Sequence, residues 1–250
     1  MKKVNKFVVA LAVVFLCSCT KTSYVIHSIE SSRVEMDNTW DAKTNPQMVA
    51  LVESYKNQLD SKMNEQVGTA AQTLSKRYPQ SLLSNFTADA MKETANQLWG
   101  DVDFAIMNMG GLRATLNEGP ITVGNLYEVY PFENRLVFLE LPGKAVQSFF
   151  EFIAFNGGQG LSNGIRLVVK NRAIESLEIG GKPLDESRIY RIATIDFLAA
   201  GNDNMTALAQ ATSLTDSGET LRNYMIQYIK NLTTNNKEAD AKLDDRITIY

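Results

Sequence analysis

The stretch VDFAIMNMGGLR, residues 102–113, decides the fold that we expect of this chain. Its first six residues, 102–107, form a nearly continuous apolar run, which predicts a buried strand that ends at a loop. In that loop the adjacent Gly110 and Gly111 let backbone amides approach a ligand closely, and Arg113 can pair with an anion. A Gly-Gly turn after a strand is also common without any ligand, so this stretch alone leaves the function open.

Helical and strand-like patterns mix irregularly on both sides of this stretch. Helices are expected, from apolar spacing and capping residues such as Asn85 and Thr122, at residues 85–99, 122–129, 143–155 and 217–232. Strands are expected, from short apolar or alternating runs, at residues 135–141, 167–169, 173–179, 190–194 and 247–249. Because strict βαβ alternation is absent, the pattern predicts a single layered α/β (α+β) domain with a mixed sheet and flanking helices.

The chain divides into three parts by composition. Residues 1–18 have the pattern of a signal peptide, because three lysines precede an apolar run of ten residues, too short to span a membrane. Residues 19–44 are polar and predict a tether. Residues 45–250 are expected to form the folded domain, which begins with a long amphipathic helix over residues 46–75, where apolar residues recur every three or four positions.

The end of the signal segment, Leu16-Cys17-Ser18-Cys19, resembles the bacterial lipobox. In that pattern an aliphatic residue lies three positions before the modified cysteine and a small residue lies just before it. The resemblance implies cleavage before Cys19 and lipidation of Cys19, and hence a lipid-anchored protein of the bacterial cell envelope, facing the periplasm or on the outer membrane. The alternative is an ordinary secreted protein with two stray cysteines.

The overall composition excludes several classes of protein. With 44% hydrophobic and 21% charged residues, the chain is neither fully disordered nor a multi-span membrane protein. One histidine, and two cysteines that both precede residue 20, leave little for a zinc site or a Ser-His-Asp triad. Removing residues 1–18 would leave 22 basic and 28 acidic residues, a net charge of −6, which argues against nonspecific binding of nucleic acid.

Two further loops each carry a large aromatic residue. The first is Pro131-Phe132-Glu133-Asn134, and the second, DFLAAGNDN at residues 196–204, is crowded with turn-forming residues. An aromatic side chain in such a turn is typical of a ligand platform, but loop aromatics also fold into the core.

Taken together, these loops resemble the C-terminal, nucleotide-specificity domain of the 5′-nucleotidases, UDP-sugar hydrolases and 2′,3′-cyclic nucleotide phosphodiesterases. The family's Asn-Gly-Gly-Gly-Ile-Arg corresponds to residues 108–113, its Tyr-Glu-Val-x-Pro-Phe-x-Asn to 127–134, and its Asn-Phe-Leu-Ala-x-Gly-Gly-Asp-Gly to 196–204. Its Leu-Gly-Asn-Leu-x-x-Asp-Ala-Met corresponds to residues 83–91. The resemblance runs from about residue 45 to residue 249 and implies the family's fold.

The resemblance also implies roles for particular residues. Phe132 and Phe197 correspond to the two aromatics that sandwich the base, and Asp203 to the carboxylate that accepts the ribose hydroxyls. Flat apolar faces suit a base, because stacking contributes about 1–3 kcal/mol per base and tolerates many bases.

Four more residues complete the implied site. Asn108 and Gly110 correspond to the loop that touches the edge of the base, and Arg77 and Arg113 to arginines that bind the phosphate and help to hold the ribose. A guanidinium fork suits an anion in both charge and geometry.

The chain departs from the family pattern at several of these positions. Met109 replaces a glycine and is expected to narrow the loop beside the base. Glu133 follows the first sandwich phenylalanine and is expected to repel an anion. Asn204 replaces the last glycine of its motif, but asparagine tolerates a positive φ, so the turn is expected to survive.

In the family, this domain follows a metallophosphoesterase domain that carries a pair of metal ions, whereas here only signal and tether precede residue 45. Hydrolysis with two metals needs ions that activate water and stabilise both the attacking and the leaving oxygen. We therefore assign no catalytic residue, metal ligand or cofactor to this chain and expect no hydrolysis from it alone. The divalent metal pair is expected on a partner chain.

Three functions from different classes follow. The first is the nucleotide- or nucleoside-binding half of a split 5′-nucleotidase, completed by a separate metallophosphoesterase chain that docks on the helix expected over residues 46–75. The second is a membrane-tethered nucleotide-binding lipoprotein without catalysis. The third is a structural protein that keeps the fold without the pocket, against which Phe132, Phe197 and Asp203 argue. A metallophosphoesterase reading frame beside this one would favour the first.

Overall fold

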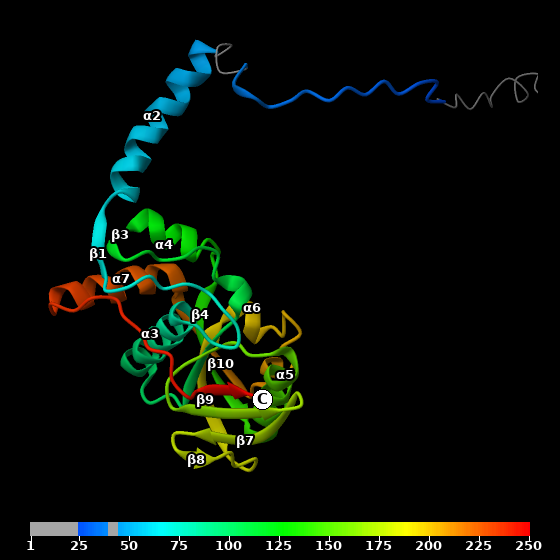
Figure 1. The fold of residues 1–250 in the computed structure, drawn as a ribbon, viewed down its shortest axis with the longest axis vertical. Helices are drawn as coiled ribbons and strands as arrows, with labels where there is room; N and C mark the ends of the chain where they lie inside the picture. The colour runs from blue at the N-terminus through cyan, green and yellow to red at the C-terminus, as the bar shows by residue number, and fades with distance from the viewer. Residues whose placement is uncertain (1–24, 40–44) are drawn as a thin grey trace, which may run out of the picture. The chain divides into compact units, whose positions relative to one another are not determined.

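The computed structural model describes residues 25–39 and 45–250 (Figure 1). The chain divides into two structural units, Met1–Leu51 and Val52–Tyr250. In the first unit, residues 25–39 are exposed throughout. The helices and strands that form the sheets and the core all belong to the second unit.

The predicted signal peptide over residues 1–18 and the predicted lipidation site, Cys19, lie outside the described residues. The predicted tether over residues 19–44 is described only at residues 25–39. No helix in the described part of the chain is both long enough and apolar enough to cross a bilayer.

The central element of the second unit is a five-stranded sheet with the strand order β10-β4-β9-β2-β5. The strands are β2 (Phe104–Met107), β4 (Arg135–Pro142), β5 (Gly160–Leu161), β9 (Ile189–Ile195) and β10 (Ser213–Thr220). Strands β2 and β9 run parallel, and the other neighbours are antiparallel. This mixed sheet confirms the predicted fold class, and all four residues of β2 are buried as its apolar run predicts.

The remaining strands form two smaller sheets. The four-stranded sheet has the order β11-β6-β7-β8, and β1 pairs antiparallel with β3. These strands are β1 (Gln66–Ala70), β3 (Gly119–Thr122), β6 (Ile165–Lys170), β7 (Ala173–Ile179), β8 (Lys182–Pro183) and β11 (Ile247–Ile249).

Helices cover both faces of the five-stranded sheet (Figure 1). Helix α3 (Leu82–Trp99) lies on one face and α5 (Gly143–Asn156) on the other, and the remaining helices are α4 (Val123–Val129), the short α6 (Asp196–Ala199) and α7 (Leu221–Thr234). On one face Trp99 of α3 stacks on Phe138 with a centroid distance of 5.2 Å, and on the other Phe150 of α5 lies 5.4 Å from Phe104. These aromatic contacts anchor α3 and α5 to opposite sides of the sheet.

Capping residues set the helix boundaries, and one of them was predicted correctly. Thr122 caps α4, because its side chain accepts a hydrogen bond from the backbone N–H of Asn125, as predicted. Helix α3 is capped by Ser81 rather than by Asn85, which lies buried inside the helix and donates to the carbonyl of Lys242 instead. The prediction that Asn85 caps this helix was therefore wrong.

The helix expected over residues 217–232 begins later, at Leu221. The residues before it form the edge strand β10, which pairs with β4, and Thr220 then caps α7 by accepting from Asn223 N–H. Sequence alone does not show that Asp216 and Thr220 have partners in β4, because β4 lies far away along the chain.

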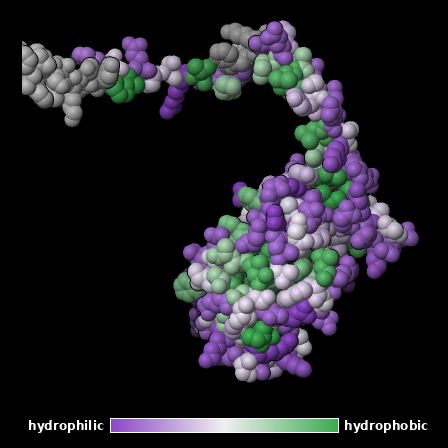
Figure 2. Space-filling model, turned by 180° about the vertical axis from the view of Figure 1, so that it is seen from behind, coloured by the Kyte–Doolittle hydropathy of each residue, from purple (hydrophilic) through white to green (hydrophobic). Residues whose placement is uncertain are grey.

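The prediction of a long helix over residues 46–75 is also wrong for its second half. Helix α2 covers Pro46–Met63 only, and the chain then enters strand β1. Residues 68–70 of β1 pair with residues 119–121 of β3, and Gly68 lets the strand approach α7, since a Cβ there would lie 2.5 Å from Ile229 Cγ2. Helix α2 has no buried residue, and Figure 2 shows hydrophobic residues spaced among hydrophilic ones along its surface.

Candidate functional site

Sheet topology brings three distant loops to one edge of the five-stranded sheet. Strands β2 and β9 are parallel neighbours, so their carboxyl ends, followed by residues 108–113 and 196–204, lie at the same edge. Strand β4 runs antiparallel to β9, so its amino end, preceded by residues 131–134, lies at this edge too. These are the three loops that the sequence analysis singled out.

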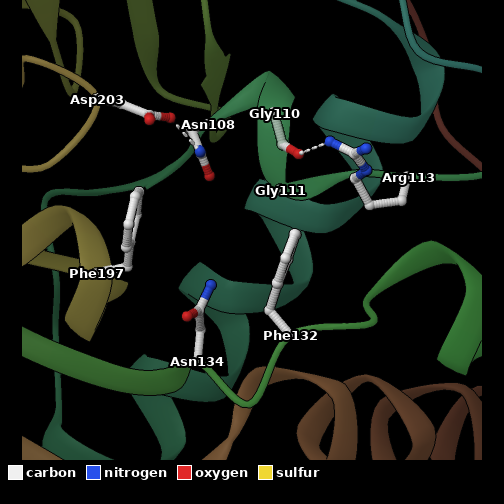
Figure 3. A pocket seen from close by; sticks show the side chains of 8 residues that line it. All are labelled: Asn108, Gly110, Gly111, Arg113, Phe132, Asn134, Phe197 and Asp203. Atoms are coloured by element: carbon white, nitrogen blue, oxygen red, sulfur yellow. Dashed lines mark hydrogen bonds between the residues drawn. The ribbon is translucent and has the colours of Figure 1, made fainter. Parts of the chain in front are cut away.

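The three loops enclose a pocket of about 270 Å³ (Figure 3). Its lining residues are Asn108, Gly110, Gly111, Arg113, Phe132, Asn134, Phe197 and Asp203. Phe132 and Phe197 lie on either side of the cavity, and they are 47% and 38% exposed. Neither phenylalanine therefore belongs to the core, and the space between the two rings is open to a flat ligand.

Asn108 and Asp203 form one wall of the pocket. Asn108 is buried, and its Nδ2 donates to Asp203 Oδ2 (Figure 3). A carboxylate can only accept, so this contact fixes the orientation of the amide. The Oδ1 atom of Asn108 is buried and accepts a hydrogen bond from no group in the described residues. The turn that presents Asp203 is left-handed, with φ of 54° at Asp203 and 61° at Asn204, so the turn survives the loss of the family glycine as expected.

The two glycines of the 108–113 loop differ in the space around them. A Cβ at Gly111 would lie 2.3 Å from Met107 Cε and 2.7 Å from Asn108 Oδ1, so no other residue fits there without a shift. A Cβ at Gly110 would make only ordinary contacts, 3.5 Å from Asn108 Nδ2 and 3.7 Å from Asp203 Oδ2. Gly110 thus keeps the wall beside the Asn108–Asp203 pair open, whereas a Cβ at Gly111 would displace the side-chain ends of Met107 and Asn108.

Met109 does not narrow the pocket, contrary to expectation. Its side chain is almost completely buried and does not line the cavity. Its backbone N–H donates to Gln159 Oε1 at 2.9 Å, which holds the loop against the segment before β5. The residue that replaces the family glycine therefore packs into the protein core.

Arg113 lies at the mouth of the pocket. Its backbone N–H is fixed by a 2.9 Å hydrogen bond to the carbonyl of Val129. Within the described part of the chain, its guanidinium makes one side-chain hydrogen bond, a long one of 3.5 Å to the carbonyl of Gly110 (Figure 3). Most of its donors therefore remain available to an anion that enters the pocket.

Six of the seven residues predicted for the site line this pocket, and Arg77 does not. Arg77 is exposed, although its neighbour Lys76 donates to the carbonyl of Leu112 at 2.7 Å and so joins this segment to the glycine loop. The sequence analysis named Gly111 only as part of a loop that can approach a ligand, and it assigned no role to Asn134, although both residues line the pocket. The signal for Asn134 was present, because it ends the Pro-Phe-x-Asn motif of the family.

Glu133 was expected to repel an anion, but it is already paired. Arg222, from α7, donates to the carboxylate of Glu133. This ion pair offsets the negative charge next to Phe132. Because Arg222 lies 90 residues away from Phe132 along the chain, no local sequence pattern indicates the pairing.

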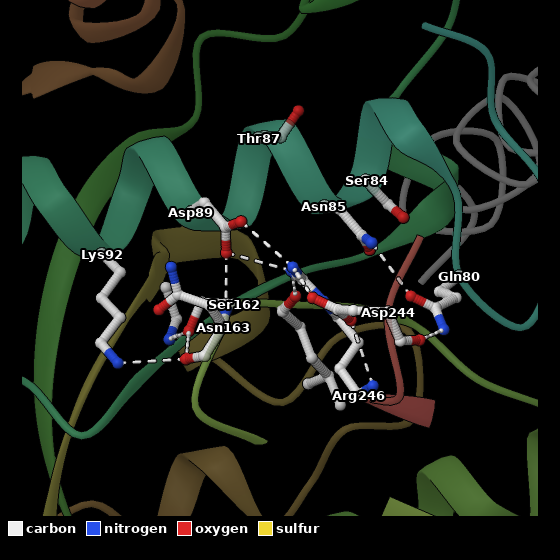
Figure 4. Close-up of polar contacts among 12 residues, drawn as sticks. Gln80, Ser84, Asn85, Thr87, Asp89, Lys92, Ser162, Asn163, Asp244 and Arg246 are labelled. Atoms are coloured by element: carbon white, nitrogen blue, oxygen red, sulfur yellow. Dashed lines mark hydrogen bonds and ion pairs between the residues drawn. The ribbon is translucent and has the colours of Figure 1, made fainter. Parts of the chain in front are cut away.

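A second polar cluster lies away from the pocket, around Arg246 (Figure 4). Arg246 is 4% exposed and donates to the carboxylates of Asp89 and Asp244 and, at 2.7 Å, to the carbonyl of Leu161. Its Nε, Nη1 and Nη2 atoms all have partners. The cluster thereby joins the segment before β11 to α3 and β5, and it leaves no guanidinium nitrogen for a ligand.

A larger cavity of about 410 Å³ borders this cluster and is lined by Phe86, Asp89, Lys92, Glu93, Asn96, Asn163, Tyr228 and Asp240. Burial lowers the pKa of the Lys92 ammonium, and Lys92 donates to the carbonyl of Asn163 at 3.1 Å. Tyr228 donates to Glu93 at 2.8 Å. No group of three or more His, Cys, Asp or Glu residues within residues 25–39 and 45–250 is placed to hold a metal ion.

Comparison with known families identifies the fold. The family model described as "5'-nucleotidase, C-terminal domain" matches residues 66–210, which is more than half of the chain. The chain therefore belongs to the 5′-nucleotidase C-terminal domain family, and the resemblance seen in its motifs is confirmed.

Individual relatives agree with this assignment. Protein UshA of Yersinia enterocolitica is 28% identical over 201 residues, a match that covers 77% of this chain and 36% of UshA. The trifunctional nucleotide phosphoesterase protein YfkN of Bacillus subtilis is 29% identical over 230 residues, covering 81% of this chain and 15% of YfkN. The crystal structure of the 5′-nucleotidase precursor from Thermus thermophilus superposes with a TM-score of 0.71 at 28% identity, covering 80% of this chain and 42% of that structure. The chain thus spans less than half the length of these relatives.

Proposed function

We propose that this chain binds a nucleotide or nucleoside in the pocket at the sheet edge and serves as the nucleotide-binding half of a split 5′-nucleotidase. The observation that carries the proposal is the pair of half-exposed phenylalanines, Phe132 and Phe197, on either side of a cavity. Two flat apolar faces around an open space suit a base, which stacks on aromatic side chains.

The polar groups of the pocket suit the rest of a nucleotide. Asp203 has acceptor oxygens for the ribose hydroxyls, and its contact with Asn108 holds it in place. Arg113 has free guanidinium donors at the mouth, where a phosphate attached to the ribose would lie. Arg77 does not line the pocket, so we assign it no contact with the base or the ribose. It enters this proposal only as a second ligand of the phosphate.

The hydrolytic step is assigned to another chain. Paired divalent ions activate the attacking water and stabilise the attacking and leaving oxygens of phosphoryl transfer. We propose that a separate metallophosphoesterase chain holds these ions, because the sequence has a single histidine, His27, and because residues 66–210 match only the C-terminal domain of the family. In this scheme the protein contributes recognition of the base and ribose rather than a catalytic residue.

The proposed location is the bacterial cell envelope, with a lipid on Cys19. A Cys19→Ala variant should be released from the membrane fraction, whereas Cys17→Ala should remain there. Equal retention of the two variants would overturn the lipid anchor and leave the binding proposal untouched.

Calorimetric titration of the purified chain with adenosine and AMP tests the binding proposal. We expect both to bind, and AMP to bind more tightly because of Arg113. If neither ligand produces heat or raises the melting temperature of the folded protein, the pocket is not a nucleotide site.

A second experiment separates a split enzyme from a membrane-tethered binding protein without catalysis. The second function is favoured by the fact that three loops of this chain by themselves place two aromatic rings, an amide and a carboxylate around one cavity. The chain with added Mn²⁺ should release no phosphate from AMP. Adding a metallophosphoesterase chain encoded beside it should create or redirect nucleotidase activity if the enzyme is split, and should change nothing if the chain only binds.

A further inference from the structure

The loop that carries Phe132 has little side-chain packing of its own. Pro131, Phe132 and Glu133 are exposed, and Asn134 is only half buried. A small cavity of about 10 Å³, lined in part by Tyr130, Phe132 and Leu221, also borders the loop. Side-chain burial therefore does not fix the Phe132 ring, and other contacts must hold the loop in place.

The first turn of α7 supplies those contacts. The backbone N–H of Leu221 donates to the carbonyl of Asn134 at 2.9 Å. Arg222 Nη1 donates to the carbonyl of Tyr130 at 3.1 Å and, more weakly, to that of Phe132 at 3.5 Å. Arg222 Nη2 donates to Glu133, so a single guanidinium reaches three points of the loop, before, at and after Phe132.

Arg222 is held in one orientation. It is only 4% exposed, and its guanidinium lies over the ring of Tyr127 in α4, 4.0 Å from the centroid. A buried cation needs several partners, and two carbonyls, a carboxylate and an aromatic face provide them for Nη1, Nη2 and the guanidinium plane, while Nε is buried without a hydrogen-bond partner in the described residues. Lysine cannot reproduce this set, because it lacks the planar fork that reaches separate acceptors.

From these contacts we propose that Arg222 is a positioning residue that sets the place of the Phe132 ring, and so the width of the gap into which the base inserts. The inference rests on the proposed nucleotide binding, which it deepens. Arg222 does not line the pocket and acts only through the loop. Its pairing with Glu133 has a second effect, since it offsets a negative charge beside the entrance for a phosphate.

The test compares Arg222→Lys with a matched control, Arg191→Lys. Arg191 also lies over an aromatic ring, 3.9 Å from the centroid of Trp99, and donates to the carbonyl of Trp99, but it does not line the pocket. Affinity is measured by calorimetry with adenosine, which has no phosphate, so that a changed charge near the entrance does not affect the result. Arg222→Lys should weaken adenosine binding about tenfold, part of the loss expected on removing one stacking face, while Arg191→Lys should leave it within about twofold.

A double-mutant cycle with Phe132→Ala separates positioning from a general structural role. If Arg222 acts through Phe132, then Arg222→Lys should change adenosine affinity less than about twofold once Phe132 is alanine. The proposal is overturned if Arg222→Lys still weakens adenosine binding about tenfold in the Phe132→Ala protein.

A second variant covers the case in which Arg222→Lys unfolds the protein. Glu133→Gln changes an exposed partner of Arg222 and should weaken adenosine binding about two- to threefold. Unchanged adenosine affinity in a folded Glu133→Gln protein would also count against the proposal.

Hydrogen exchange tests the anchoring of the loop independently of the proposed nucleotide binding. The amides of residues 132–134 should exchange faster in Arg222→Lys than in the wild type, and should be unchanged in Arg191→Lys. If the wild type binds no adenosine while exchange still accelerates, nucleotide binding fails and the anchoring of the loop stands. If exchange in this loop does not change, Arg222 does not position Phe132, whether or not adenosine binds.

Discussion

The pocket and the Arg246 cluster are built from the same residue types with opposite results. In the cluster, all three guanidinium nitrogens of Arg246 have partners, including the carboxylates of Asp89 and Asp244. In the pocket, Arg113 and Asp203 each make one side-chain hydrogen bond within the described residues, and the two are not paired with each other. The difference shows that arginine and aspartate hold the fold where their hydrogen bonds are satisfied internally, and offer a binding surface where they are not.

The same contrast applies to burial. Arg246 is 4% exposed, so its guanidinium depends on these partners for its hydrogen bonds, although the carboxylates of Asp89 and Asp244 still reach water. Arg113 is exposed and lies at the mouth of a cavity. Substitutions should therefore affect stability in one region and ligand affinity in the other.

The largest expected effect is the loss of stability in Arg246→Met. Removing the guanidinium leaves the carbonyl of Leu161 and the partly exposed carboxylates of Asp89 and Asp244 without their partner, and we expect the free energy of unfolding to fall by about 2–4 kcal/mol. Urea unfolding followed by circular dichroism measures it, with Arg113→Met as the control, which should change stability by less than about 0.5 kcal/mol. Equal losses in the two variants would remove the distinction between the regions.

The next effect concerns the two phenylalanines. Phe132→Ala or Phe197→Ala should weaken adenosine binding by about 1–3 kcal/mol, because each removes one stacking face. Both rings are partly exposed, so neither change should destabilise the protein strongly. Phe104→Ala is the control, since this fully buried residue should lose about 3–5 kcal/mol of stability. A Phe132→Ala protein that loses as much stability as Phe104→Ala would show that Phe132 is a core residue.

A smaller effect separates phosphate recognition from base recognition. Arg113→Ala should weaken AMP by about 1.5 kcal/mol, the contribution of a hydrogen bond to a charged group, and should leave adenosine nearly unchanged. Calorimetry with the two ligands gives the difference directly. The assignment of Arg113 to the phosphate is wrong if both ligands lose affinity equally.

The smallest effect is the pH dependence of the Arg246 cluster. Burial of Asp244 opposes ionisation, but the hydrogen bonds and charge of Arg246 outweigh it and hold the pKa of Asp244 below its ordinary value. A lowered pKa in the folded state stabilises the protein above the unfolded-state pKa of about 3.9, and this stabilisation is lost as the pH falls through the folded-state pKa. Asp244→Asn should therefore be less stable than the wild type near neutral pH, and the gap should narrow as the pH falls from about 4 towards 2.

Since the Asp244 side chain is 45% exposed, we expect that gap to stay below about 1 kcal/mol. Urea unfolding at a series of pH values for both proteins measures it. A gap that widens on acidification would contradict the sign of the pKa shift.

Much of the fold could be predicted from local patterns. The apolar run that ends at Met107, the Thr122 cap and the strand over residues 173–179 depend on nearby residues, and they match the structure. Six pocket residues could be predicted because they lie in loops with recognisable motifs. Local spacing failed where a distant partner decides the structure, as at Gly68, which faces α7.

The remaining errors have the same cause. Met109 was expected to narrow the loop beside the base, but its side chain is buried and its backbone N–H donates to Gln159. Arg222 and Arg246 lie outside the motifs, and their partners are more than 80 residues away in the sequence, apart from Asp244. Only the folded arrangement shows which arginines hold the structure and which one is free at the pocket.

The position of Arg246 also has a consequence for folding during synthesis. Asp89 is made 157 residues before the arginine that pairs with it. At roughly 5–20 residues per second, helix α3 emerges from the ribosome about 8–30 s before its carboxylate gains a partner. During that interval α3 and β5 lack the contact that ties them to β11, so a nascent chain that pauses in this window exposes an incompletely closed domain to chaperones and proteases.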